Sequence, residues 1–82
     1  MIEKEYHTYL KLERGLSPNS VAAYEQDLLR LRSYMDAHGI DIVRATYDDL
    51  QAFVFDTFKS ISSVRTQARL IAGIHSFYRF LL

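Results

Sequence analysis

The sequence predicts an all-α protein, a compact bundle of four helices joined by short loops. Apolar residues recur at helical spacing in four segments, and residues that start or stop helices stand between those segments. Alternation with a period of two never persists over five residues, so no strand is expected. Because 82 residues barely suffice to stabilise one core, and no repeat or low-complexity tract divides them, we expect residues 1–82 to form a single domain.

The first two helices are separated by a well-marked break. The first is expected over residues 2–13, where apolar and charged side chains fall on opposite sides. Gly15 then suits the left-handed conformation that ends helices. Ser17 offers an N-cap oxygen and Pro18 fits the first helical position, so a second helix starts here and runs to about His38, before a glycine.

The third helix follows a connector over residues 40–45. Thr46 and Asp49 form a T-x-x-D start that resembles a capping box, with Asp in place of the usual Glu. The helix that they open is expected to turn four apolar side chains inward, which are Leu50, Phe53, Val54 and Phe58. A short polar link over residues 59–63 then leads to the last helix.

The last helix, expected from residue 64 and capped by Ser62 or Ser63, has two faces. The apolar face consists of Val64, Ala68, Ile71, Ile74, Tyr78 and Leu81. The other face consists of Arg65, Arg69, Ala72, Ser76 and Arg79. Gly73 in mid-helix should cost about 1 kcal/mol relative to alanine, which indicates that another helix or a ligand approaches the backbone there.

These four helices predict both a core and a free face. The expected core residues are Val21, Tyr24, Leu28, Leu31, Leu50, Phe53, Ile71, Ile74, Phe77, Tyr78 and Leu81. Truncation of Ile71 to alanine is then expected to cost about 2–5 kcal/mol. Arg65 and Arg69, one turn apart, should project from the outer face and be replaceable without disturbing the packing.

Composition excludes several kinds of protein. The chain has no cysteine, so it has no disulfide or thiolate metal site, and its three histidines lack metal-ligand spacing. No segment has the apolar length of a signal peptide or membrane span, which predicts a soluble, intracellular protein. With no glycine-rich phosphate loop, nucleophile motif or suitable carboxylate pair, we expect neither a catalyst nor a cofactor. Seven of the aromatic residues fall mostly on core stripes, so packing is expected rather than base stacking.

Charge is segregated along the chain although the formal net charge is zero. Residues 59–82 carry four cations and no acid, whereas residues 39–58 carry a net charge of −3. A neutral total argues against a free-standing nucleic-acid binder, but it can conceal a basic face.

Two groups of residues are candidates for binding an anion. Ser17, Asn19 and Ser20 converge at a helix N-terminus, where free N–H groups bind phosphate readily; the alternative is that Ser17 only caps the helix. Arg65, Thr66 and Arg69, with Ser76 and Arg79, lie on the last helix, and arginine suits contact with phosphate or guanine edges. The alternatives there are a solvated face, or ion pairs with the acid-rich third helix.

The chain resembles the N-terminal core-binding domain of tyrosine recombinases, the Xer and phage-integrase group. The matching pattern covers residues 2–82 and comprises Tyr9-Leu10, Glu13-Arg14-Gly15-Leu16-Ser17-Pro18-Asn19-Ser20, Ala23-Tyr24, Asp27-Leu28, Arg65-Thr66, Ala68-Arg69 and His75-Ser76-Phe77-Tyr78-Arg79-Phe80-Leu81. Ser20 departs from the family pattern, in which threonine is frequent, but it keeps the hydroxyl.

The resemblance implies a SAM-like four-helix bundle that closes over one face of duplex DNA through its second and fourth helices. It implies DNA contacts from Ser17, Asn19, Ser20 and Tyr24, and from Arg65, Thr66 and Arg69. The family's catalytic residues belong to a separate C-terminal domain, so this chain is expected to be non-catalytic.

We therefore expect a DNA-binding module of a site-specific tyrosine recombinase or integrase, cytoplasmic and encoded by a bacterium or phage. Its expected partners are duplex DNA, the C-terminal catalytic domain of the parent chain and other recombinase protomers, with no membrane. Alone it should be a monomer that binds DNA weakly. The alternative is a helical protein-interaction module whose polar face meets an acidic partner.

Overall fold

The computed structural model describes residues 2–82 and confirms the all-α, SAM-like four-helix architecture, with no strand in that range. The helices are α1 (Ile2–Thr8), α2 (Pro18–Ala37), α3 (Tyr47–Phe58) and α4 (Val64–Leu81). Two short elements join them: α1 continues into the π-helical turns of η1 (Tyr9–Glu13), and the 3₁₀ turn η2 (Ile42–Arg44) precedes α3. No helix among these residues is long and apolar enough to cross a membrane.

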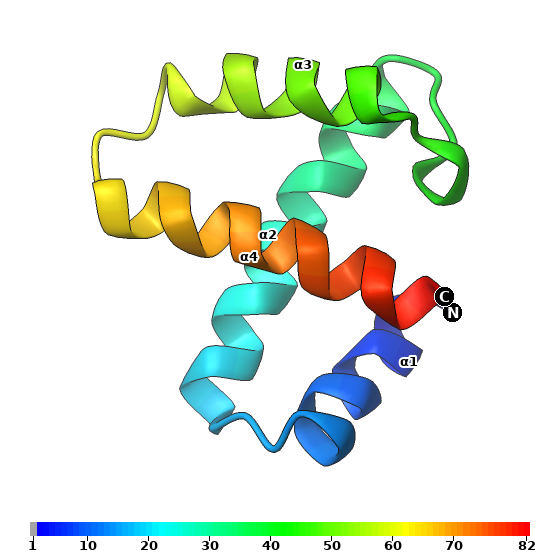
Figure 1. The fold of residues 1–82 in the computed structure, drawn as a ribbon, viewed down its shortest axis with the longest axis vertical. Coiled ribbons are helices and arrows are strands. Elements are labelled where there is room, and N and C mark those ends of the chain that lie inside the picture. Colours follow the sequence, from blue (N-terminus) through cyan, green and yellow to red (C-terminus); the bar gives the residue numbers. More distant parts are fainter. Residues whose placement is uncertain (1) are drawn as a thin grey trace.

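The crossing of α2 and α4 forms the centre of the molecule (Figure 1). The other helices are added on either side of it: α1 packs along the middle of α2, where Glu3 contacts Arg32 and His7 contacts Glu25, and α3 lies near the C-terminal part of α2. The first helix also meets the last one, since the ring centroids of Tyr6 and Phe80 lie 5.5 Å apart. The N-terminal halves of α2 and α4 diverge from the crossing and reach the same side of the molecule.

The predicted break before α2 and the predicted start and end of α2 are confirmed. Gly15 has φ +60 and Gly39 has φ +69, so both adopt the left-handed backbone that favours glycine. Ser17 is the N-cap of α2 and its side chain accepts a hydrogen bond from the Ser20 N–H. The Ile40 N–H donates to the Met35 carbonyl at 2.8 Å and thereby closes the C-terminal turn.

The capping of α3 and α4 is confirmed as well. Thr46 and Asp49 form a complete capping box, with the Thr46 N–H donating to Asp49 Oδ2 at 2.9 Å and the Asp49 N–H donating to Thr46 Oγ1 at 3.2 Å. Of the two serines expected at the start of α4, Ser63 is the cap. The connector before α3 was predicted to contain no helix or strand, but the 3₁₀ turn η2 lies within it and buries Ile42.

The core is partly the one predicted. Val21, Leu28, Leu31, Phe53, Ile74 and Phe77 are buried, as expected, and so are Tyr6, Leu10, Met35, Ile42 and Leu70. Tyr24, Leu50, Tyr78 and Leu81 pack against this core but are only partly buried. The assignment of Ile71 to the core is wrong, since 41% of this residue is exposed.

The error at Ile71 arises from the rotation of α4 about its own axis. This helix buries Leu70, Gly73, Ile74 and Phe77, so the inward face is centred between the two faces expected from the sequence. Val64, at the start of the expected apolar face, is 77% exposed. Half of the apolar stripe of α4 therefore points away from the core.

Gly73 lies against α2, which identifies the approaching group as a helix. A Cβ atom at this position would lie 3.6 Å from both Cβ and Oδ2 of Asp27, an ordinary van der Waals distance. Gly73 thus faces a polar residue of α2 at the crossing, at a distance that would also accommodate a methyl group.

Candidate nucleic-acid interface

The first turn of α2 is an exposed polar surface. The Ser17 hydroxyl donates to Ser20 Oγ at 3.1 Å and accepts from the Ser20 N–H at 3.3 Å. Asn19 is exposed, while Ser20 is half-buried. Ser17 therefore caps the helix, as one alternative held, and the oxygen lone pairs and Asn19 amide of this turn still face solvent.

The most strongly bonded charged residue of α4 is Arg69, which holds a buried carboxylate of α2. Its Nε donates to Asp27 Oδ2 at 2.9 Å and its Nη2 donates to Oδ1 at 3.0 Å, a bidentate pair. The Asp27 side chain is 3% exposed and that of Arg69 is 35% exposed. The hydrogen bonds to Asp27 raise the pKa of Arg69, so the guanidinium stays charged.

This pair corrects one expectation and one alternative from the sequence. Arg69 does not project freely from an outer face, because two of its nitrogens bind an acid that the core encloses. Its partner also lies on α2 and not on the acid-rich third helix. Ser76, placed with the cations by helical periodicity, is buried at 3% exposure, because it lies beside the buried Tyr6 of α1, whereas Ala72 and Arg79 of the same stripe are exposed.

The pair joins the two candidate groups. Successive residues of an α-helix are about 100° apart, so Ser20, Tyr24 and Asp27 share one side of α2. Tyr24 lies close enough to Arg69 to contribute to its electrostatic environment. The structure therefore brings Tyr24 and Arg69 together at the crossing, whereas Ser17 and Asn19 lie about two turns away at the end of α2.

Arg65 and Thr66 lie one turn before Arg69, at the start of α4. Arg65 is exposed, and no carboxylate of residues 2–82 comes within 4.0 Å of its guanidinium. Thr66 is half-buried, and its N–H donates to Ser63 Oγ at 3.3 Å. Arg65 is thus free to meet an external anion at the start of α4, and Arg79, which is also exposed, lies at the opposite end of the helix.

Asp27 is the residue that sequence reasoning missed. The signal was present, because an acid lies among the apolar positions Val21, Tyr24, Leu28 and Leu31 on the inward side of α2. A carboxylate on such a face requires a partner, and the arginine stripe of the last helix could supply one.

The remaining chemistry of the chain is limited. No group of three or more His, Asp or Glu side chains that could hold a metal ion occurs within the described range. The seven aromatic residues expected to pack, Tyr6, Tyr9, Tyr24, Phe53, Phe58, Phe77 and Tyr78, are all buried or half-buried, which confirms that expectation.

Comparison with known proteins identifies relatives along the whole chain. The chain is 34% identical over 82 residues to tyrosine recombinase XerC of Listeria monocytogenes serotype 4a (strain HCC23), which covers 99% of this chain and 27% of that protein. It is 39% identical over 84 residues to tyrosine recombinase XerD of Listeria monocytogenes serotype 4b (strain F2365), covering 100% of this chain and 28% of that protein. No solved structure shows significant similarity.

The chain thus spans a little over a quarter of the length of these relatives. The family model of the phage integrase N-terminal SAM-like domain matches residues 4–82, which is nearly the entire sequence. This chain belongs to the phage integrase N-terminal SAM-like domain family.

Proposed function

We propose that this chain is the DNA-binding, non-catalytic module of a site-specific tyrosine recombinase and that it binds one face of duplex DNA through α2 and α4. The observation that carries the proposal is the Asp27–Arg69 pair, which fixes the polar first turn of α2 and the cationic start of α4 on one side of the molecule. A polar helix N-terminus and a free arginine on the same side of the molecule suit contacts at separate points of a phosphate backbone.

Each residue of this face has a distinct proposed role. Ser17, Asn19 and Ser20 contact phosphate oxygens at the start of α2, and Arg65 and Thr66 do so from α4. Tyr24 lies beside Arg69 and donates its hydroxyl to the DNA backbone. Arg69 positions the two helices through Asp27 and offers its remaining N–H groups to DNA, since its side chain is 35% exposed.

We further propose that residues 1–82 act as one domain of a longer protein. The relatives are called tyrosine recombinases, and this chain covers 27–28% of their length. The proposed partners are duplex DNA, a C-terminal catalytic domain of the same parent chain and other recombinase protomers, in the cytoplasm of a bacterium. DNA breaking and rejoining would belong to the catalytic domain.

Salt dependence of binding to duplex DNA tests the proposal. Contacts with phosphates release counterions, so log K should fall linearly with log salt at a slope of roughly −0.9 per contact. Arg65→Ala should make this negative slope shallower by about 1 and weaken binding uniformly across DNA sequences. Fluorescence anisotropy of a labelled duplex measures both effects.

Arg79→Ala is the matched control, because Arg79 is an exposed arginine at the opposite end of the same helix. Its loss should leave DNA binding unchanged. A folded Arg65→Ala variant with wild-type affinity and slope would refute the proposed face. A chain that does not bind DNA at low salt would instead favour a module that binds an acidic protein.

A further inference from the structure

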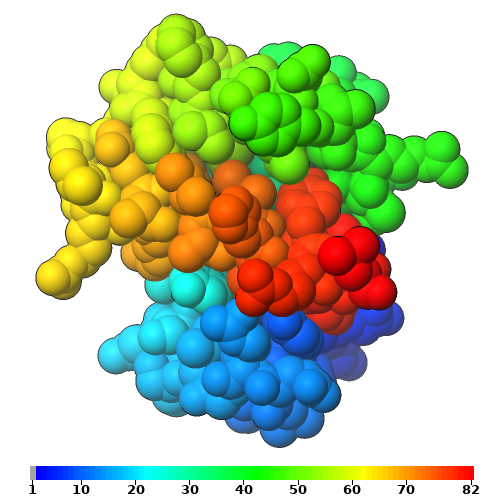
Figure 2. Space-filling view, in the orientation of Figure 1, coloured from blue at the N-terminus to red at the C-terminus, as the bar shows by residue number. Residues whose placement is uncertain are grey.

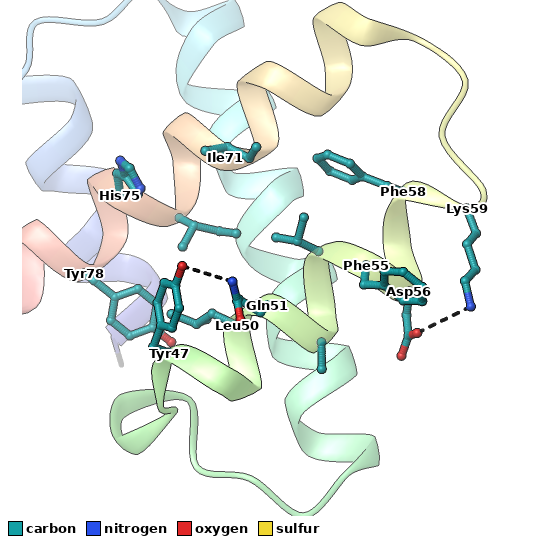
Figure 3. Close-up of a pocket in the computed structure, with 13 residues that line it drawn as sticks. Tyr47, Leu50, Gln51, Phe55, Asp56, Phe58, Lys59, Ile71, His75 and Tyr78 are labelled. Atoms are coloured by element: carbon teal, nitrogen blue, oxygen red, sulfur yellow. Dashed lines mark hydrogen bonds and ion pairs between the residues drawn. The ribbon is translucent and has the colours of Figure 1, made fainter.

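The side of α4 opposite Asp27 borders an open groove that plays no part in the proposed DNA contact. The groove has a volume of about 1130 Å³ and lies between α3 and α4, which run side by side on the face shown in Figure 2. In Figure 3, Tyr47 and Tyr78 lie at one end and Lys59 and Asp56 at the other. Most of its lining is apolar.

Large apolar side chains are concentrated on this groove and remain exposed. Tyr47 is 73% exposed, Phe55 is 68% exposed and Ile71 is 41% exposed. Single apolar residues on a surface are ordinary, but a cluster of them along one hollow is typical of a site that another molecule covers. The exposure of Ile71 thus reflects a second apolar face of α4, in addition to the one in the core.

The groove and the proposed DNA-binding face lie on opposite sides of α4. At about 100° per residue, Ile71 lies about 200° around the helix from Arg69, and His75 lies on the same side as Ile71. A molecule in the groove would therefore leave Arg65 and the start of α2 uncovered. Both faces can be occupied at the same time.

The charge beside the groove is negative. Residues 39–58 carry a net charge of −3, and Asp48 is exposed in the first turn of α3. Burial, together with the charges of Asp41 and Asp49, raises the pKa of Tyr78 to about 12, which places both carboxylates near the Tyr78 end of the groove. Lys59 is the one cation in the lining, and it lies at the other end, 3.9 Å from Asp56 and 4.6 Å from the centre of the Phe55 ring.

We propose that this groove binds an amphipathic helix of a partner protein, with apolar residues facing the groove and lysine or arginine residues flanking them near the Tyr78 end. Apolar anchors at positions i, i+3, i+4 and i+7 fit a groove between two helices. Since α3 has 12 residues and is about 18 Å long, the partner contributes roughly three turns. The acids of α3 select the basic flanks and disfavour acidic ones.

Two synthetic peptides of about 18 residues provide the test. Both carry leucine at helical i, i+3, i+4 and i+7 spacing, but one has lysine and the other glutamate at all remaining positions. Amide chemical shifts of the ¹⁵N-labelled chain are followed during titration with each peptide. The lysine peptide should perturb the amides of α3 and of residues 71–78, and should bind at least about tenfold more tightly than the glutamate peptide.

Variants locate the binding site without disturbing the core. Tyr47→Ser and Phe55→Ser remove exposed apolar side chains of the groove and should each weaken binding of the lysine peptide about tenfold. Leu29→Ser is the matched control, because Leu29 is 54% exposed on α2 and does not line the groove. Asp48→Asn should weaken binding of the lysine peptide and strengthen that of the glutamate peptide, because it removes a charge that attracts the first and repels the second.

Several results would overturn the proposal. Equal affinities for the two peptides would remove the selection for a basic helix. A loss of affinity in Leu29→Ser as large as in Phe55→Ser would show binding outside the groove. Self-association of the chain in sedimentation, abolished by Phe55→Ser, would identify a second copy as the occupant.

Discussion

The two sides of α4 differ in how completely they are packed. Toward α2, Gly73 lies against Asp27, and Arg69 satisfies both oxygens of this carboxylate, which is 3% exposed. Toward α3, the same helix leaves Ile71 41% exposed beside an open groove. One side thus has a fixed geometry supplied by directional bonds, while the other has apolar surface without a partner. A fixed geometry suits proposed contacts with rigid DNA, and an open groove suits a second polypeptide.

The attachment of α3 explains part of this difference. Among residues Tyr47–Phe58 only Phe53 is fully buried, while Leu50, Val54 and Phe58 are partly buried against the core. The Tyr34 hydroxyl of α2 also donates to Asp56 Oδ2 at 2.9 Å. The N-terminal end of α3 is held by local capping bonds, and the hydroxyl of Tyr78 donates to the Ile42 carbonyl at 2.6 Å just before it. These bonds fix the ends of the groove but do not close it.

The largest expected effect is on the packed side. Arg69→Ala leaves Asp27 buried without a partner, and removal of one member of a buried ion pair typically costs about 3–5 kcal/mol. Urea unfolding should show this loss, whereas Arg65→Ala should change stability by less than about 1 kcal/mol, because Arg65 is exposed. Equal stability of the two variants would mean that Arg69 makes no stabilising contact with Asp27, as expected from the sequence.

A pair of neighbouring residues tests the rotation of α4. Leu70 is fully buried, so Leu70→Ala should cost about 2–5 kcal/mol through lost burial and a residual cavity. Ile71→Ala should cost less than about 1.5 kcal/mol, because Ile71 already faces the groove. Thermal unfolding of both variants measures the difference, and a reversed order would restore the orientation expected from the sequence.

The Tyr78 hydroxyl makes the groove side sensitive to alkaline pH. Burial, with the nearby charges of Asp41 and Asp49, raises the pKa of Tyr78 to about 12 from its ordinary value of 10.0. Since the folded state holds the proton more tightly than the unfolded state, this contribution to stability is complete below pH 10 and is lost as the pH rises toward 12. After allowance for partial exposure, it amounts to about 1–2 kcal/mol.

Tyr78→Phe isolates this contribution, because it keeps the ring and removes the ionisable group. Denaturant unfolding between pH 8 and pH 12 should show a steeper loss of stability in the wild type than in the variant. Parallel curves would mean that Tyr78 ionises equally in the folded and unfolded states.

Local signals in the sequence predicted most of the fold. The start of α2 at Ser17 and Pro18 and the capping box at Thr46 depend on residues a few positions apart, so sequence alone was sufficient. The rotation of α4 was not predictable in this way, because apolar residues occur on two of its faces and only packing against α2 selects Leu70 over Ile71.

The candidate site was likewise predictable where it depends on local sequence and not where it depends on tertiary contacts. The polar turn at Ser17 and the arginines of the last helix were visible in the sequence, but their connection depends on Asp27 and Arg69, which are 42 residues apart. The groove was not visible either, since the sequence does not show that α3 and α4 lie side by side with the exposed Tyr47, Phe55 and Ile71 along the hollow between them.

The smallest expected effect concerns Gly73, at the point where α2 and α4 meet. Alanine in place of glycine in a helix interior adds about 1 kcal/mol of helix stability. The new Cβ would lie 3.6 Å from Asp27 Cβ and Oδ2, an ordinary contact that requires no displacement of α2. Gly73→Ala should therefore raise the free energy of unfolding by up to about 1 kcal/mol and leave the Asp27–Arg69 pair intact, which urea unfolding can measure. If Gly73→Ala destabilises the protein instead, Asp27 lies closer to Gly73 than the 3.6 Å separation from a new Cβ implies. The packing of α4 against α2 would then depend on the glycine as well as on the ion pair.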